Sequence, residues 1–93
     1  MAYLQTHFWP GATEEQYNKT VAVVHPGGAL PEGQIYHAAG PTEGGMLIAA
    51  VWESKEQSDD FVQNTLLAAM PIEGGVEGQP QERAAGVINL QSA

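Results

Sequence analysis

The chain has 93 residues, a length that fits one domain and leaves no room for a second module. Hydrophobic residues make up 43% and charged residues 15%, as in a globular protein, and no apolar run reaches the roughly 18 residues of a membrane helix. Only 3 Lys and Arg residues accompany 11 acidic ones, so nucleic acid and anionic membranes are poor partners for this net charge of -8. The chain has no cysteine, which excludes disulfides, thiolate metal sites and a cysteine nucleophile.

The distribution of the acidic residues favours a solvated surface, and the N-terminal sequence predicts that the protein is not exported. The acidic residues are scattered along the chain, as on a surface that aids solubility. The first residues, Met-Ala-Tyr-Leu-Gln-Thr-His, contain neither a basic start nor an apolar stretch of signal-peptide length. We therefore expect a cytoplasmic protein.

The first predicted element is a strand over residues 2–9. This segment is rich in aromatic residues and its side chains alternate between two sets, and Pro10 followed by Gly11 ends it. One of the two strand faces would carry Tyr3, Gln5, His7 and Trp9.

Two capping boxes predict two helices. Thr13, with Gln16 three residues later, begins the first helix, which ends at His25 before Pro26. Ser54, in the sequence Ser-Lys-Glu-Gln, begins the second helix, which runs until Pro71. The helical apolar stripes are Tyr17, Val21 and Val24 in the first helix, and Phe61, Val62, Thr65, Leu66 and Ala69 in the second.

Three further strands are predicted. Residues 34–39 and 46–52 form two of them, joined by a turn over residues 40–45, so this pair is antiparallel. The run Met-Leu-Ile-Ala-Ala-Val-Trp at 46–52 is apolar on both faces, as in a central strand covered on both sides. Residues 72–82 form a glycine-rich connector, and residues 83–90 supply the last strand.

The order strand, helix, strand, strand, helix, strand predicts an α+β fold. It is the ferredoxin-like βαββαβ arrangement, a four-stranded antiparallel sheet with both helices on one face, and it spans residues 1–93 as a single domain. The other face of the sheet is then uncovered. Because the central strand is apolar on both faces, we expect a second copy of the chain to cover it in a homodimer.

Histidines on the predicted strands are candidate bases. His7 would be a titratable base beside two aromatic rings and an amide if its face lines a pocket; otherwise it lies at a dimer interface or on the surface. His37 follows Tyr36, and only one of these two neighbours points to the pocket. His25 follows a helix, whose C-terminus favours imidazolium, and a structural or solvated role is predicted for it.

Aromatic residues are the candidate substrate-binding groups. Trp9 and Trp52 offer large apolar surfaces that stack a planar ligand or pack in the core or interface. Tyr3, Tyr17 and Tyr36 have phenolic hydroxyls that donate to a substrate carbonyl or to a backbone oxygen. We single out Trp9, Tyr36, Tyr3 and Trp52 as substrate-binding candidates.

Several other chemistries have no pattern in the sequence. The histidines show neither HxH nor HExxH spacing, so no metal site is predicted. There is no GxSxG motif, and Ser54 is explained by its capping role. The paired glycines have no following lysine and serve as turns rather than as a phosphate-binding loop. We expect no cofactor.

The segment from Val51-Trp52-Glu53-Ser54-Lys55-Glu56 to Phe61, preceded by His37-Ala38-Ala39-Gly40-Pro41, resembles the dimeric α/β-barrel superfamily that contains the antibiotic biosynthesis monooxygenases. The resemblance covers most of the chain. It implies two ferredoxin-like subunits packed sheet to sheet, each with a pocket between its sheet and its helices. Where several relatives carry charged residues in the strand before Trp-Glu-Ser, this chain has Leu47 and Ala50, which favours a hydrophobic pocket.

The resemblance implies a cofactor-independent monooxygenase-like enzyme. Its substrate would be a small hydrophobic phenol, quinone or polyketide-like molecule, with His37 or His7 accepting a proton and with Trp9 and Tyr36 shaping the pocket. Three alternatives stay open: a non-enzymatic dimeric module that binds a small apolar ligand, a haem-binding protein, and an isomerase or cyclase.

Overall fold

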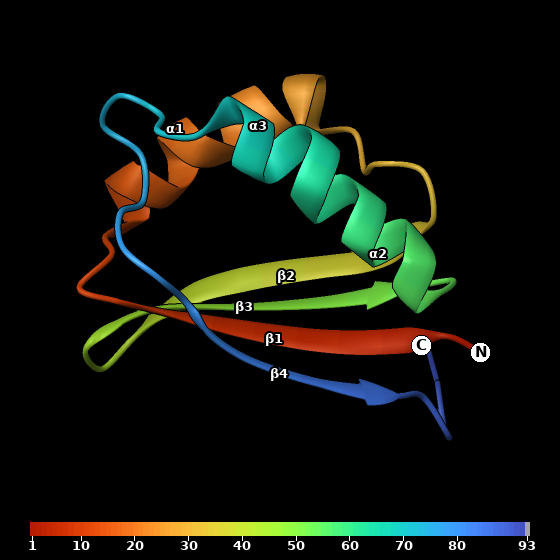
Figure 1. Ribbon diagram of the computed structural model, residues 1–93. Coiled ribbons are helices and arrows are strands. Elements are labelled where there is room, and N and C mark those ends of the chain that lie inside the picture. Colours follow the sequence, from red (N-terminus) through yellow and green to blue (C-terminus); the bar gives the residue numbers. More distant parts are fainter. Residues whose placement is uncertain (93) are drawn as a thin grey trace.

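The computed structural model, which describes residues 1–92, has one antiparallel sheet with helices on one of its faces (Figure 1). The strands are β1 (Tyr3–Pro10), β2 (Gln34–Thr42), β3 (Gly45–Trp52) and β4 (Gln81–Gly86). Their order across the sheet is β2-β3-β1-β4. The expected α+β, ferredoxin-like βαββαβ fold is thereby confirmed, with β3 in a central position as its apolar sequence predicted.

Helix α1 (Glu14–Val24) begins as its capping box predicts. The Thr13 hydroxyl accepts from the Gln16 N–H at 3.1 Å, and the Gln16 side chain accepts from the Thr13 N–H at 2.9 Å. Two of the N–H groups that a helix start leaves unpaired are thus satisfied. The helix ends at His25, and the single turn η1 (Pro26–Gly28) follows.

The second helical segment is less regular than predicted. It consists of α2 (Lys55–Phe61), the π-helical turn η2 (Val62–Leu66) and α3 (Leu67–Ala69). Ser54 caps its start by accepting from the Gln57 N–H at 3.2 Å, but the Gln57 side chain bonds to the Ser54 hydroxyl at 3.1 Å, so the capping box is only half formed. The π turn inserts an extra residue and thereby turns the following side chains to a new face.

Several strands end at other residues than predicted, because hydrogen bonding to a neighbouring strand decides where each strand ends. Strands β2 and β3 continue to a two-residue turn at Glu43-Gly44, where Gly44 has a φ of +85° that suits glycine. Strand β4 lies at residues 81–86 rather than 83–90. Its last residue, Gly86, pairs with Tyr3, the first residue of β1, and a backbone bond from the Val87 N–H to the Ala2 carbonyl at 2.9 Å follows the strand.

The two faces of the sheet differ in what covers them (Figure 1). A small core of Trp9, Met46, Ala12 and Val76 lies on the face toward the helices. The opposite face leaves large apolar side chains exposed, and Leu47 is 46% exposed in the single chain. Among residues 1–92, no helix is long and apolar enough to cross a membrane.

Candidate functional site

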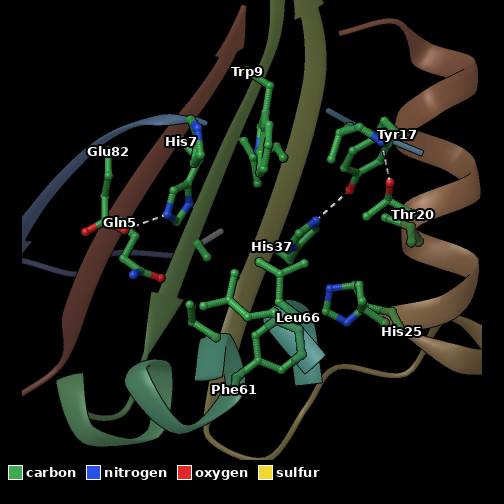
Figure 2. A pocket seen from close by; sticks show the side chains of 18 of the residues that line it. Gln5, His7, Trp9, Tyr17, Thr20, His25, His37, Phe61, Leu66 and Glu82 are labelled. Carbon is green, nitrogen blue, oxygen red and sulfur yellow. Dashed lines mark hydrogen bonds and ion pairs between the residues drawn. The ribbon is translucent and has the colours of Figure 1, made fainter. Parts of the chain in front are cut away.

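A cavity of about 270 Å³ lies between the inner face of the sheet and the helices (Figure 2). Its size is near the lower end for small-molecule sites. Its wall is mostly apolar, formed by Trp9, Val21, Val24, Ile48, Ala50, Trp52, Phe61, Val62, Leu66, Leu67, Met70, Val76 and Pro80. Its polar lining residues are Gln5, His7, Tyr17, Thr20, His25, Gln34, His37, Gln79 and Glu82. The hydrophobic pocket that the sequence favoured is present, with Ala50 in its wall and Leu47 outside it.

Strand β1 supplies three side chains to the cavity. Gln5, His7 and Trp9 alternate along the strand and share the inner face, as their spacing predicted. Tyr3 does not line the cavity, since it lies at the start of the strand, where it pairs with Trp52 and Gly86. The prediction of Tyr3 as a substrate-binding residue therefore has no support from its position.

A β-bulge in β2 decides which of two neighbours faces the cavity. The register shifts between Gln34 and Tyr36, so that Gln34 pairs with Trp52 and His37 pairs with Ala50. Gln34 and His37 therefore both point inward, and both line the cavity. Tyr36 lies on the opposite face, 46% exposed, and its predicted place in the pocket is wrong.

The π turn places the second helical segment against the cavity. Phe61 and Leu66, which both line the cavity, are five residues apart, the spacing of a π turn. A regular helix would instead have presented Thr65, which is exposed. Leu67 and Met70 continue the apolar wall on the same side.

Tyr17, His37 and His25 form a polar group at one side of the cavity (Figure 2). The Tyr17 hydroxyl lies 2.6 Å from His37 Nε2, and the two rings are stacked at 6.2 Å. The His25 ring meets His37 edge-on at 5.0 Å and stacks on Phe61 at 5.5 Å. His25 is only 6% exposed, so the solvated role considered for it is wrong.

Burial keeps this polar group uncharged at neutral pH. Burial lowers the pKa of His37, and the neighbouring His25 lowers it further. Burial also lowers the pKa of His25, although a backbone hydrogen bond to Ala29 acts in the opposite direction. Burial raises the pKa of the Tyr17 phenol. One hydrogen bond therefore joins the neutral phenol of Tyr17 to the neutral imidazole of His37 at Nε2, and the His37 tautomer sets which of the two donates. The Nδ1 atoms of His25 and His37 are buried without a hydrogen-bond partner among residues 1–92, so a water or a ligand in the cavity would be needed to satisfy them.

His7 has a different partner at the other side of the cavity. Glu82 lies directly across from His7 in the pairing of β1 with β4, and its Oε2 lies 2.7 Å from His7 Nε2. The side chains are 18% and 48% exposed, respectively, so this pair reaches solvent. An imidazole held by a carboxylate is the arrangement of an oriented general base.

Two other polar residues of the lining are occupied by structural hydrogen bonds. The buried indole of Trp52 donates to the Gln5 side chain at 3.0 Å, which joins β3 to β1 beneath the cavity. The Thr20 hydroxyl donates to the Gln16 carbonyl at 2.9 Å and accepts from the Val76 N–H at 3.0 Å. These bonds hold the cavity wall together.

The arrangement offers little to a metal ion. Within residues 1–92, no three His, Asp or Glu side chains gather as metal ligands do. The chemistry available from the described side chains is proton transfer by imidazole and hydrogen bonding by phenol and amide groups.

Three residues of the site, Tyr17, His25 and Glu82, were not among the site residues that the sequence analysis selected. Tyr17 was placed on the apolar stripe of its helix, and its phenol reaches the cavity because that stripe faces the sheet. His25 follows the last turn of α1, and its position after Val24 on the buried stripe was a usable signal. Glu82 carried no signal, because its register with His7 depends on how two distant strands pair.

No protein-family model matches the chain, and no curated protein matches it. Several solved structures match the chain. A protein from Chloroflexus aurantiacus J-10-fl, provisionally named an antibiotic biosynthesis monooxygenase, has a TM-score of 0.67 and 15% identity over 99% of this chain and 98% of its own. Rv0793 from Mycobacterium tuberculosis has a TM-score of 0.63 and 12% identity over 98% of both chains.

A third solved structure is a variant of SnoaB, a cofactor-independent oxygenase from Streptomyces nogalater. It has a TM-score of 0.59 and 11% identity over 96% of this chain and 94% of its own. At such low identities these similarities concern the fold. The chain therefore has the ferredoxin-like fold of antibiotic biosynthesis monooxygenase-like proteins over nearly its whole length.

Proposed function

We propose that the protein is an enzyme that oxygenates a flat, hydrophobic phenol or quinone-type molecule without a cofactor. The observation that carries the proposal is that two of the three imidazoles lining one mostly apolar cavity, His7 and His37, come from strands on either side of it. A planar ligand would stack against Trp9 and Phe61, and an imidazole would accept its proton. The similarity in fold to an oxygenase that needs no cofactor agrees with this chemistry.

The reaction needs only a base and molecular oxygen. Removal of the hydroxyl proton makes the phenol an electron-rich phenolate, which reduces oxygen directly. For a phenol with a free position opposite its hydroxyl, one oxygen atom joins the ring and the other leaves as water, giving the quinone. The protein would supply orientation, an apolar environment and the proton acceptor.

Oxygen uptake tests this proposal. We would supply air-stable naphthols and compare the wild type with a His7→Gln, His37→Gln double variant. The proposal expects uptake above the protein-free rate, reduced at least tenfold in the double variant. The control is Glu56→Gln, which alters an exposed residue of α2 outside the cavity and should keep the wild-type rate. Unchanged uptake in the double variant would exclude the histidines as bases.

A non-enzymatic ligand-binding module is the second candidate function. The observation that favours it is the short bond between Tyr17 and His37, which occupies the imidazole nitrogen that would otherwise accept a proton. A binding module would take up a naphthol in the cavity with no oxygen consumption. Calorimetric binding without uptake, abolished by a bulky Ala50→Trp change in the wall, would identify this function.

We further propose that the protein works as a homodimer. The sheet face opposite the helices bears the exposed side chains of Leu4, Tyr36 and Leu47. Pairing places Leu4 and Tyr36 on either side of Val51, so these residues form one apolar surface across β1, β3 and β2. Burying this surface against a second copy would remove it from water.

A further inference from the structure

The polar groups of the cavity are separated into two ends. His7 and Glu82 come from β1 and β4, whereas Tyr17 and His37 come from α1 and β2 (Figure 2). Strands β1 and β2 have β3 between them, which sets them about 10 Å apart. The apolar residues Ile48 and Ala50 of β3, which pair with His7 and His37 respectively, lie between the two ends in the cavity wall. A ligand that spans the cavity would meet a polar group at each end.

The end formed by His7 and Glu82 has the chemistry of a base. A carboxylate only accepts hydrogen bonds, so His7 Nε2 must carry the hydrogen that bonds to Glu82 Oε2 at 2.7 Å. This fixes the tautomer and leaves a free lone pair on His7 Nδ1. When Nδ1 accepts a proton, the resulting imidazolium is paired with the Glu82 carboxylate.

The end formed by Tyr17 and His37 suits hydrogen bonding instead. His37 faces a neutral phenol at 2.6 Å and a second imidazole, His25, so a positive charge on it has no counter-ion there. The carboxylate of Glu82 bonds to His7 at the far end. The Tyr17 hydroxyl makes one hydrogen bond with His37 and has capacity for a second, so it can bond to an oxygen of the ligand.

We propose that Glu82 is a positioning residue that makes His7 the base, and that Tyr17 with His37 binds a second oxygen of the substrate. This rests on the proposed oxygenase function and specifies its substrate class as flat aromatic molecules that have oxygens at opposite ends and a free ring position opposite the hydroxyl that loses its proton, such as naphthalene-1,5-diol. In the proton-transfer step, the O–H bond of one hydroxyl breaks and a bond from that hydrogen to His7 Nδ1 forms. The products are a phenolate and an imidazolium paired with Glu82.

The first test measures binding and needs no turnover. Naphthalene-1,5-diol has hydroxyls at opposite ends, and 1-naphthol lacks one of them. The wild type should bind the diol about tenfold more tightly than the naphthol, and Tyr17→Phe should abolish this preference while 1-naphthol binding stays within about twofold. Equal losses for both ligands in Tyr17→Phe would overturn the role given to Tyr17.

The second test concerns Glu82. Glu82→Gln keeps the shape but has an amide that both donates and accepts, whereas Glu77→Gln removes an equal charge at an exposed site in the connector. Glu82→Gln should lower kcat about tenfold or more with KM nearly unchanged, and Glu77→Gln should leave both at wild-type values. The nitrogen chemical shifts of His7 in NMR should show the Nε2–H tautomer in the wild type and a mixture of tautomers in Glu82→Gln.

The two readouts separate the inference from the function on which it rests. If no phenol is turned over, the oxygenase function fails, but the diol preference and the His7 tautomer still test the two ends of the cavity. An unchanged tautomer and an unchanged kcat in Glu82→Gln, in a protein that does oxidise phenols, would overturn the positioning role alone.

Discussion

Replacement of Trp52 by Phe should destabilise the protein by about 3 kcal/mol. The Trp52 side chain is 1% exposed and its indole N–H donates to the side-chain oxygen of Gln5, a residue that is 4% exposed. Loss of the larger ring removes buried apolar area and leaves a gap, at about 1 to 2 kcal/mol. The Gln5 oxygen then lacks a donor in a buried position, which costs about 1 to 3 kcal/mol more.

Urea unfolding followed by circular dichroism, at one fixed protein concentration, measures this change. A loss of about 3 kcal/mol corresponds to a Tm lower by roughly 12 to 24 °C for a chain of this size. In a Gln5→Met background, where no acceptor remains to be orphaned, Trp52→Phe should cost only about 1 to 2 kcal/mol. Equal costs in the two backgrounds would refute the contribution assigned to this hydrogen bond.

Three further outcomes follow from the structure. The proposed homodimer predicts that Leu47→Glu, on the uncovered sheet face, halves the mass measured by analytical ultracentrifugation, whereas Val23→Glu, at an exposed helix position, leaves it unchanged. Burial lowers the pKa of His25 and His37 in the folded protein, so the unfolded state binds more protons below the ordinary histidine pKa of 6.5. The free energy of unfolding should therefore fall as the pH drops below 6.5, and the urea midpoint should decrease with it. In His25→Phe this decrease should be less steep, because one of the two histidines is gone. Thr13→Ala should cost about 1 kcal/mol in urea unfolding through loss of the N-cap.

Local sequence patterns predicted most of the fold. The capping residues Thr13 and Ser54 mark the helix starts because their side chains bond within one turn. The alternation in β1 and the two-sided apolar run of β3 gave the strand types, and their order gave the topology. The end of β4 at Gly86 was not predictable from its own residues, because it depends on where β1 begins.

The candidate site was predicted only in part, for a physical reason. Alternation placed His7 and Trp9 on one face, since β1 has no bulge between them, but it left open whether that face lines the cavity. In β2 the register shift near Tyr36 breaks the simple alternation, and the choice between Tyr36 and His37 depended on it. The contacts of Tyr17 and Glu82 join elements far apart in the chain, and local periodicity carries no information on them.

Oxygen consumption by the wild type with naphthols, measured beside the His7→Gln, His37→Gln double variant, tests the central claim most directly. The account predicts uptake above the protein-free rate that falls at least tenfold in the double variant, while the variant still binds the naphthol in the cavity. Tight naphthol binding by the wild type with uptake no faster than the protein-free rate would contradict it and would identify a ligand-binding module instead.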